Sequence, residues 1–246
     1  MKTVLHKADS RGHAEHGWLK SWHTFSFAGY HDPQRMHFGA LRVLNDDIFA
    51  GGMGFGMHPH DNMEIITIPL SGQLEHSDSM GNSGTISKGE VQVMSAGSGL
   101  QHSEKNKNSD EPVKLLQIWV FPNKKNVEPR YDQKVFDLSA AKNKLLTIVS
   151  PMGKTDARPE DSVGRGLNIY QDAWFSLGKL EKDFTTTYSL HKKENGVYAF
   201  VIEGDVTING EKLNRRDGLG ITDADKPRVE IKADSDAELL LMEVPV

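Results

Sequence analysis

The sequence predicts an all-β protein built from two similar halves. Short apolar or alternating runs recur along the whole chain, separated by glycine, asparagine and aspartate, which favour turns. Helix signals are few, and the apolar segments of the two halves can be aligned with each other. A chain of 246 residues is long enough for two domains, each with a core of its own.

The expected strands account for most of the apolar runs. In chain order they cover residues 65–70, 91–94, 113–121, 197–202, 206–208 and 238–244. The most specific local signal is the hairpin VTINGEKL, in which Asn209 and Gly210 supply the positive φ angles of a type I′ turn. Asp137 can cap a short helix through LSAAKNKL, where we place the connection between the halves. The expected domains are therefore residues 1–132 and 133–246.

Composition excludes several kinds of site and partner. The chain has no cysteine, which rules out disulfides, zinc–thiolate clusters, iron–sulfur centres and thiol nucleophiles. Its net charge is -5 and its basic residues are scattered, so direct binding to nucleic acid is not expected. The N-terminal segment lacks the apolar run of a signal peptide, and no run is long enough to span a membrane. We therefore expect a cytoplasmic protein without a membrane partner.

The most informative residues are two pairs of potential metal ligands. MHPHDNME contains His58 and His60, and GLQHSEKN contains His102 and Glu104. Side chains two residues apart in a strand point to the same face, so two such pairs on facing strands would form a site of three histidines and one carboxylate. Fe(II), Mn(II), Ni(II), Cu(II) and Zn(II) all suit these ligands. Glu64, in phase with the first pair, is the alternative carboxylate or an acceptor beside the ligands.

The second half repeats the strand pattern without these ligands. The first half reads MEIITIPLSGQLEHS and the second GVYAFVIEGDVTING, so Gly72 aligns with Gly204. On this alignment no histidine stands opposite His58 or His60. We therefore expect a metal only in the N-terminal domain, and none in the C-terminal one.

Two segments resemble a known family. GGMGFGMHPHDNME is similar to the first signature of the cupin superfamily, with its glycine, two histidines and glutamate at the usual spacing. The second signature is looser, because Ser95 stands where proline is usual and the loop before His102 is longer. These departures, together with HTFSFAGYHDPQRMHFGALRVLNDD, resemble bacterial members of the pirin family.

The resemblance implies a bicupin, with two jelly-roll β-sandwich domains and iron in the N-terminal one. The pirin ligands fall on His58, His60, His102 and Glu104. It further implies a metal-dependent dioxygenase of the quercetin 2,3-dioxygenase type, which cleaves a flavonol with O2 and for which Fe(II) is the expected cofactor. In that reaction Glu104 would also accept the proton of the substrate 3-hydroxyl. A eukaryotic branch of the family implies the alternative: a non-catalytic, redox-sensitive iron protein that acts through protein partners.

The remaining histidines and aromatic residues are interpreted structurally. His76, on the expected strand after Gly72, is read first as a polar strand residue, although it could line the cavity. Aromatic residues of the N-terminal segment are expected to pack in the core or between domains instead of forming a ligand cage. They are Trp18, Trp22, Phe25, Phe27 and Tyr30.

Overall fold

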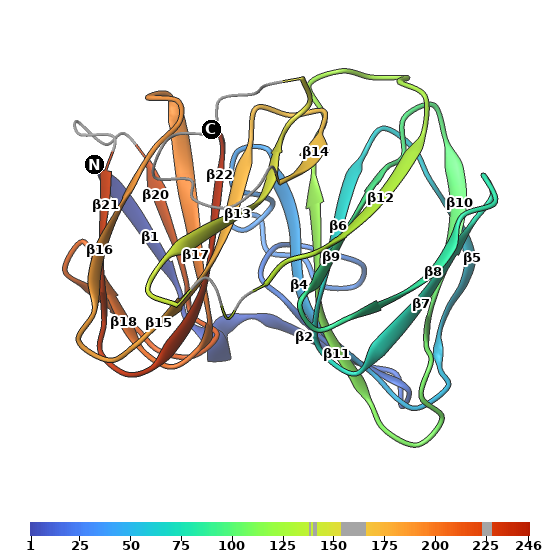
Figure 1. Cartoon of the computed structure of the whole chain (residues 1–246), viewed down its shortest axis with the longest axis horizontal. Coiled ribbons are helices and arrows are strands. Elements are labelled where there is room, and N and C mark those ends of the chain that lie inside the picture. The colour runs from blue at the N-terminus through green and yellow to red at the C-terminus, as the bar shows by residue number, and fades with distance from the viewer. Residues whose placement is uncertain (138, 140–141, 154–165, 223–227) are drawn as a thin grey trace. The chain divides into compact units, whose positions relative to one another are not determined.

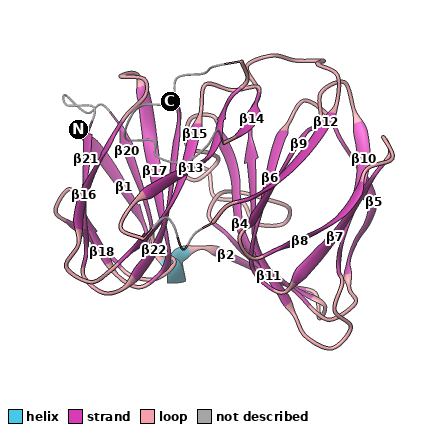
Figure 2. Ribbon diagram, in the orientation of Figure 1, coloured by secondary structure: helices cyan, strands magenta, loops and turns pink. Residues whose placement is uncertain are grey.

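The computed structural model describes residues 1–137, 139, 142–153, 166–222 and 228–246, and nearly all of its regular structure is β (Figure 2). Its named strands pair antiparallel, and the helix among the described residues is a single 3₁₀ turn, Ala8–Ser10. The expected all-β class is confirmed. No helix among the described residues is long and apolar enough to cross a membrane.

The chain folds as two compact units. The first unit comprises Gly12–Phe136 with Ile169–Gln171, and the second comprises Met1–Arg11, Asp137–Asn168 and Asp172–Val246. The division after residue 132 stays a prediction of the sequence. Of the short helix predicted over residues 138–145, residues 138, 140 and 141 lie outside the described part of the chain, and residues 142–145 form a bridge, a turn and the start of a strand instead of a helix.

The first unit is a sandwich of two sheets. Its seven-stranded sheet has the order β12 (Arg130–Val135), β9 (Glu90–Ser95), β6 (Glu64–Ser71), β11 (Val113–Val120), β4 (Leu41–Phe49), β3 (Leu19–His23) and β2 (Gly12–Glu15). Its four-stranded sheet has the order β5 (Gly54–His60), β10 (Leu100–Asn106), β7 (Gln73–Asp78) and β8 (Ser83–Ser87). Leu74 and Ile86 of the small sheet pack on Val113 and Leu115 of the large one, which buries the facing sides of both.

The second unit has the same design. Its seven-stranded sheet has the order β1 (Lys2–His6), β20 (Gly218–Thr222), β17 (Asn195–Glu203), β22 (Ala237–Pro245), β15 (Trp174–Leu180), β13 (Leu145–Pro151) and β14 (Leu167–Ile169). Its four-stranded sheet has the order β16 (Thr185–Ser189), β21 (Arg228–Ala233), β18 (Val206–Ile208) and β19 (Glu211–Leu213). In Figure 1 the first strand of the chain, β1, lies among the last strands, because it pairs with β20.

The internal repeat predicted from sequence is present in the strand order. The aligned glycines Gly72 and Gly204 directly follow the corresponding strands β6 and β17, with φ angles of 76° and 79°. A Cβ at Gly72 would lie 3.0 Å from the Cα of Val113, and one at Gly204 would lie 2.9 Å from the Cα of Ala237. Each glycine therefore provides both the left-handed turn and the close approach of the next paired strand.

The hairpin predicted around Asn209 and Gly210 is confirmed. The two residues have φ angles of 48° and 87°, as a type I′ turn requires. Ile208 pairs with Glu211 directly across the turn.

Candidate metal centre

Three of the predicted ligands meet where β5 and β10 pair. His102 on β10 lies directly opposite His58 on β5, and His60 follows two residues later on the same face. One ring nitrogen from each of the three histidines lies within 4.8 Å of the others. The strands are neighbours in the four-stranded sheet, so the two predicted pairs approach along one sheet and not across the sandwich.

The fourth residue, Glu104, lies on the buried face of β10 two residues after His102, and the register with β5 shifts between them. Its carboxylate accepts hydrogen bonds from Gln117 Nε2 at 2.8 Å and Thr67 Oγ1 at 3.3 Å. A Glu104 oxygen lies within 4.8 Å of ring nitrogens of His102 and His76, which form a second group of possible ligands. The two groups share His102, so all four predicted residues belong to one connected cluster.

Burial keeps two of the histidines neutral. Together with the neighbouring imidazoles, it lowers the pKa of His102 to about 2. It lowers the pKa of His60 to about 4. A neutral imidazole has a lone pair to offer, which is the form that binds a metal. The buried Nε2 of His102 has no hydrogen-bond partner among the described residues, so a bound cation would satisfy it.

These residues fit a divalent transition metal. The imidazole nitrogens of His58, His60 and His102 lie close enough to share one ion, and Glu104, which is grouped with His102, would add the carboxylate oxygen that such ions also accept. Burial raises the pKa of Glu104, while Gln117 and Thr67 favour its charged form. A cation beside His102 would add to that effect and hold Glu104 as a carboxylate.

Glu64 lies apart from the cluster. Strand β5 ends at His60 and β6 begins at Glu64, and in the turn between them Asn62 has a φ of 43°. The alternation of side chains along β5 therefore does not extend to Glu64. Its carboxylate instead accepts a hydrogen bond from Ser95 Oγ at 2.7 Å. Glu64 is in neither group of possible ligands.

His76 is a buried strand residue, as the first interpretation of the sequence had it, but it also lies against the cluster. Its Nδ1 is 3.5 Å from His102 Nδ1, and its ring stacks on Tyr131 with the centroids 4.6 Å apart. Its Nε2 is 3.6 Å from Asp78 Oδ2. His76 therefore contacts the Nδ1 side of the His102 ring, while the Nε2 of His102 stays available to a metal.

The histidine cluster opens into a cavity of about 460 Å³ in the first unit. His58, His60, His102 and Glu104 are all part of its wall. Its aromatic residues are Trp18, Phe27, Phe55 and Trp119. For Trp18 and Phe27 the expectation of core or interdomain packing was incomplete, since both face this cavity. Phe25 is buried as expected.

The cavity wall also contains polar residues that sequence reasoning missed: Ser21, His23, Asn45, Asp47 and Gln117. They come from three strands, and Ser21 with His23, and Asn45 with Asp47, lie two residues apart, so each pair shares one face of its strand. The available signals were polar residues inside otherwise apolar strands: Gln117 within VKLLQIWV, and the run Asn45–Asp46–Asp47 within LRVLNDDIF.

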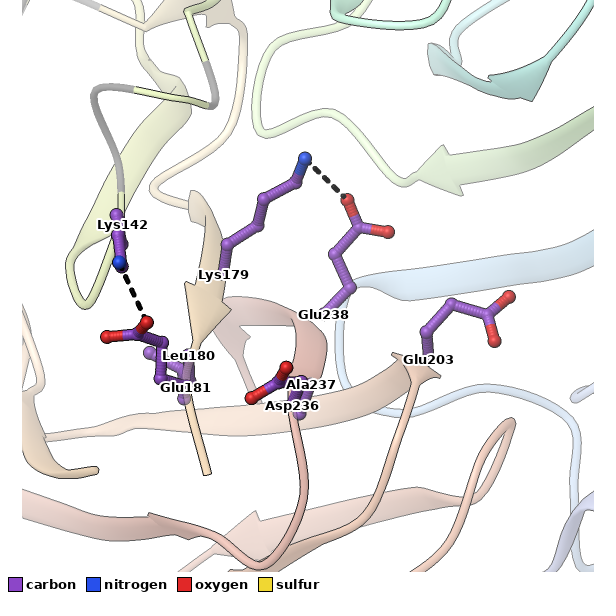
Figure 3. A pocket seen from close by; sticks show the side chains of 8 residues that line it. All are labelled: Lys142, Lys179, Leu180, Glu181, Glu203, Asp236, Ala237 and Glu238. Atoms are coloured by element: carbon purple, nitrogen blue, oxygen red, sulfur yellow. Dashed lines mark ion pairs between the residues drawn. The ribbon is translucent and has the colours of Figure 1, made fainter. Parts of the chain in front are cut away.

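The second unit has a hollow of a different kind, of about 290 Å³ (Figure 3). Two ion pairs line it, Lys142 with Glu181 at 2.7 Å and Lys179 with Glu238 at 3.6 Å, and the acidic residues Glu203 and Asp236 lie beside them. Both groups of possible metal ligands found among the described residues lie in the first unit.

Known proteins resemble the chain over almost its whole length. The family model described as pirin matches residues 4–120, and the one described as the quercetinase C-terminal cupin domain matches residues 148–244. A quercetin 2,3-dioxygenase of Escherichia coli K12 is 47% identical over 98% of each chain. The crystal structure of YhhW from Escherichia coli superposes with a TM-score of 0.90 at 46% identity, covering 100% of this chain and 99% of that one. A nickel(II) complex of the bacterial pirin YhhW from Escherichia coli has a TM-score of 0.88 at 44% identity, with 99% of each chain covered.

Proposed function

The chain belongs to the pirin family and has the two cupin-type domains of a bicupin, and on this basis we propose that it is a metal-dependent dioxygenase that cleaves a flavonol such as quercetin with O2. The single observation that supports the proposal is the position of the histidine cluster on the wall of an aromatic cavity. His58, His60 and His102 face a space of about 460 Å³, a size typical of pockets for small organic ligands. A purely structural metal would have no need of such a space.

We propose Fe(II) as the ion, held by His58, His60, His102 and Glu104. Imidazole and carboxylate accept several divalent ions, and availability in the cell decides among them. The bound ion would supply Lewis acidity, which lowers the pKa of a coordinating hydroxyl, and redox activity toward O2.

Glu104 is the proposed proton acceptor for the 3-hydroxyl of the flavonol. Burial raises its pKa, so it holds a proton more readily than an exposed glutamate does. Gln117 and Thr67 fix the orientation of its carboxylate through their hydrogen bonds. A base that is already held in position does not lose conformational entropy when it accepts the proton.

The aromatic walls hold the flat rings of the substrate and exclude water. Phe27 meets Trp119 edge to face at 5.3 Å, and Trp18 meets Phe55 in the same way at 5.1 Å. The proposed overall reaction balances with O2 as the other reactant. Both atoms of O2 enter the ring-opened ester, and one ring carbon of the flavonol leaves with its oxygen as carbon monoxide. O2 is the oxidant, and no other co-reactant is required.

The test is turnover by the metal-loaded protein. The protein is purified anaerobically, loaded with Fe(II), and mixed with quercetin and O2. We expect oxygen uptake, loss of flavonol absorbance and release of carbon monoxide. A fully metallated protein that shows none of these would refute the enzyme and favour the alternative, an iron-binding regulatory protein with protein partners.

A paired substitution tests the ligand assignment independently of turnover. His60→Ala should abolish tight metal binding, measured by elemental analysis after dialysis. His31→Ala, at an exposed position of the same unit, is the matched control and should retain the metal. Retention of a full equivalent by the His60 variant would contradict the assignment.

A further inference from the structure

A polar row crosses the cavity wall beside the histidine cluster. Strand pairing sets His23 opposite Asn45, Asn45 opposite Gln117, and Gln117 opposite Thr67. Residues directly opposite in an antiparallel sheet lie on the same face, so this row spans β3, β4, β11 and β6 on the inner side. Its far end reaches the metal centre, because Thr67 and Gln117 both hydrogen-bond Glu104.

A second polar pair stands next to this row, where Ser21 lies opposite Asp47. Ser21 Oγ donates to Asp47 Oδ1 and lies 3.2 Å from His23 Nδ1. His23 Nδ1 in turn lies 2.9 Å from Asn45 Oδ1. Because an amide oxygen can only accept, His23 has its hydrogen on Nδ1 in this arrangement.

This network leaves two polar groups unused. Asp47 Oδ2 and Asn45 Nδ2 have no hydrogen-bond partner among the described residues, and both residues line the cavity. Asp47 is 4% exposed and Asn45 is 2% exposed, so bulk water solvates neither well. Both residues line the cavity, so a ligand with matching groups would supply the hydrogen bonds that these two atoms lack.

The two groups complement a hydroxyl. They lie two residues apart on one face of β4, one a carboxylate oxygen that accepts and the other an amide that donates. A phenolic hydroxyl has both a hydrogen to donate and a lone pair to accept with. Burial, with a smaller contribution from the charge of Glu104, raises the pKa of Asp47 to about 7, so its carboxylate form, which accepts, is populated from neutral pH upward.

We propose that Asp47 and Asn45 form a second recognition point for the substrate, which binds a phenolic hydroxyl other than the oxygens that face the metal centre. Asp47 Oδ2 accepts from the hydroxyl, and Asn45 Nδ2 donates to its oxygen. The inference rests on the proposed function, because it assumes an aromatic substrate with more than one hydroxyl. It makes Asp47 and Asn45 determinants of specificity, while the histidines and Glu104 determine the chemistry.

Binding of two flavonols under anaerobic conditions tests the inference without turnover. Quercetin has hydroxyls on its outer rings, whereas 3-hydroxyflavone has only the 3-hydroxyl beside the carbonyl. Trp18 and Trp119 line the cavity, so quenching of tryptophan fluorescence reports the Kd of each ligand. Elemental analysis of each variant shows that its metal content is unchanged.

The variants are Asp47→Leu, Asp47→Asn and Asn45→Leu, with Asp110→Asn as the control for losing an exposed carboxylate of the same unit. We expect Asp47→Leu to weaken quercetin binding about tenfold or more, as loss of a hydrogen bond to a charged group does. The Kd of 3-hydroxyflavone should stay the same. Asp47→Asn preserves the shape of the side chain, so it reports on the carboxylate if the leucine variant does not fold.

The outcomes separate the inference from the proposed function. Equal losses for both flavonols would show that Asp47 acts only on the structure of the cavity, and would overturn the inference. Unchanged quercetin binding in the Asp47 and Asn45 variants would overturn it as well. Equal Kd values for both flavonols in the wild type would overturn the inference alone, whereas a wild type that binds neither would overturn the proposed function with it.

Discussion

Replacement of Glu104 by glutamine separates the role of its charge from the role of its shape. A glutamine at this position can accept from Gln117 Nε2 through its oxygen and donate to Thr67 Oγ1 through its amide, because a hydroxyl also accepts. Both hydrogen bonds of the wild type therefore have a counterpart. We expect the variant to fold, with a change in unfolding free energy below about 1 kcal/mol.

The same substitution removes the proposed base. A positioned general base contributes about 10²–10⁴-fold to a rate, which corresponds to about 2.7–5.4 kcal/mol of activation free energy. We expect kcat to fall by that factor while three histidines still hold the metal, with modestly weaker affinity. The assay is oxygen uptake with quercetin at equal metal loading, confirmed by elemental analysis of each sample.

Comparing turnover with metal content in the Glu104→Gln variant distinguishes a role as ligand from a role as base. If the variant loses turnover only because it loses metal, so that the activity per bound metal ion is unchanged, Glu104 acts as a ligand and the case for a base is removed. A kcat within roughly threefold of the wild type at full metal loading would refute the role of Glu104 as the base.

Three further predictions follow from the contacts of single residues. His76→Gln should weaken metal binding about tenfold in a chelator competition, since support for a ligating histidine is typically worth this much; unchanged affinity would show that the 3.5 Å approach to His102 has no effect. Burial raises the pKa of Glu64 from 4.5 to about 7, so the stability gained from its bound proton is present below pH 4.5 and lost as the pH rises through about 7. Glu64→Gln should flatten that fall in the Tm of the metal-free protein, and a slope equal to the wild type would contradict the linkage. Gly72→Ala should destabilise the protein more than Gly17→Ala, because both glycines have a φ near 77° but only at Gly72 does a Cβ meet backbone, 3.0 Å from Val113 Cα. Chemical denaturation of the two variants measures the difference, and equal losses would mean that the backbone angle alone matters.

Local patterns in the sequence were enough for the fold class, the repeat and the shared face of His58 and His60. His58 and His60 share a face because the side-chain period of a strand is two, and that period is set by consecutive residues. Asn209 and Gly210 form their turn for the same kind of reason, because the φ angles they adopt depend on those two residues.

The alternation of side chains between two faces holds only within one strand, so counting residues does not predict the face of a residue beyond its end. Glu64 was placed with the histidines by counting residues, but the break at residues 61–63 moves it onto β6 of the other sheet. A one-residue irregularity changes the face of every side chain beyond it, and sequence periodicity does not mark such a break.

The sequence by itself determined an all-β chain with an internal repeat and ligand-type residues in its first half, because these features arise from neighbours along the backbone. Only the tertiary structure decided what lies beside the ligands. Thr67 and Gln117 reach Glu104 from the other sheet, and Asp47 and Asn45 line the same cavity. Likewise, β1 pairs with β20 more than two hundred residues away. These contacts depend on which strands pair and which sheets face each other, and the pattern of one strand does not specify its partner.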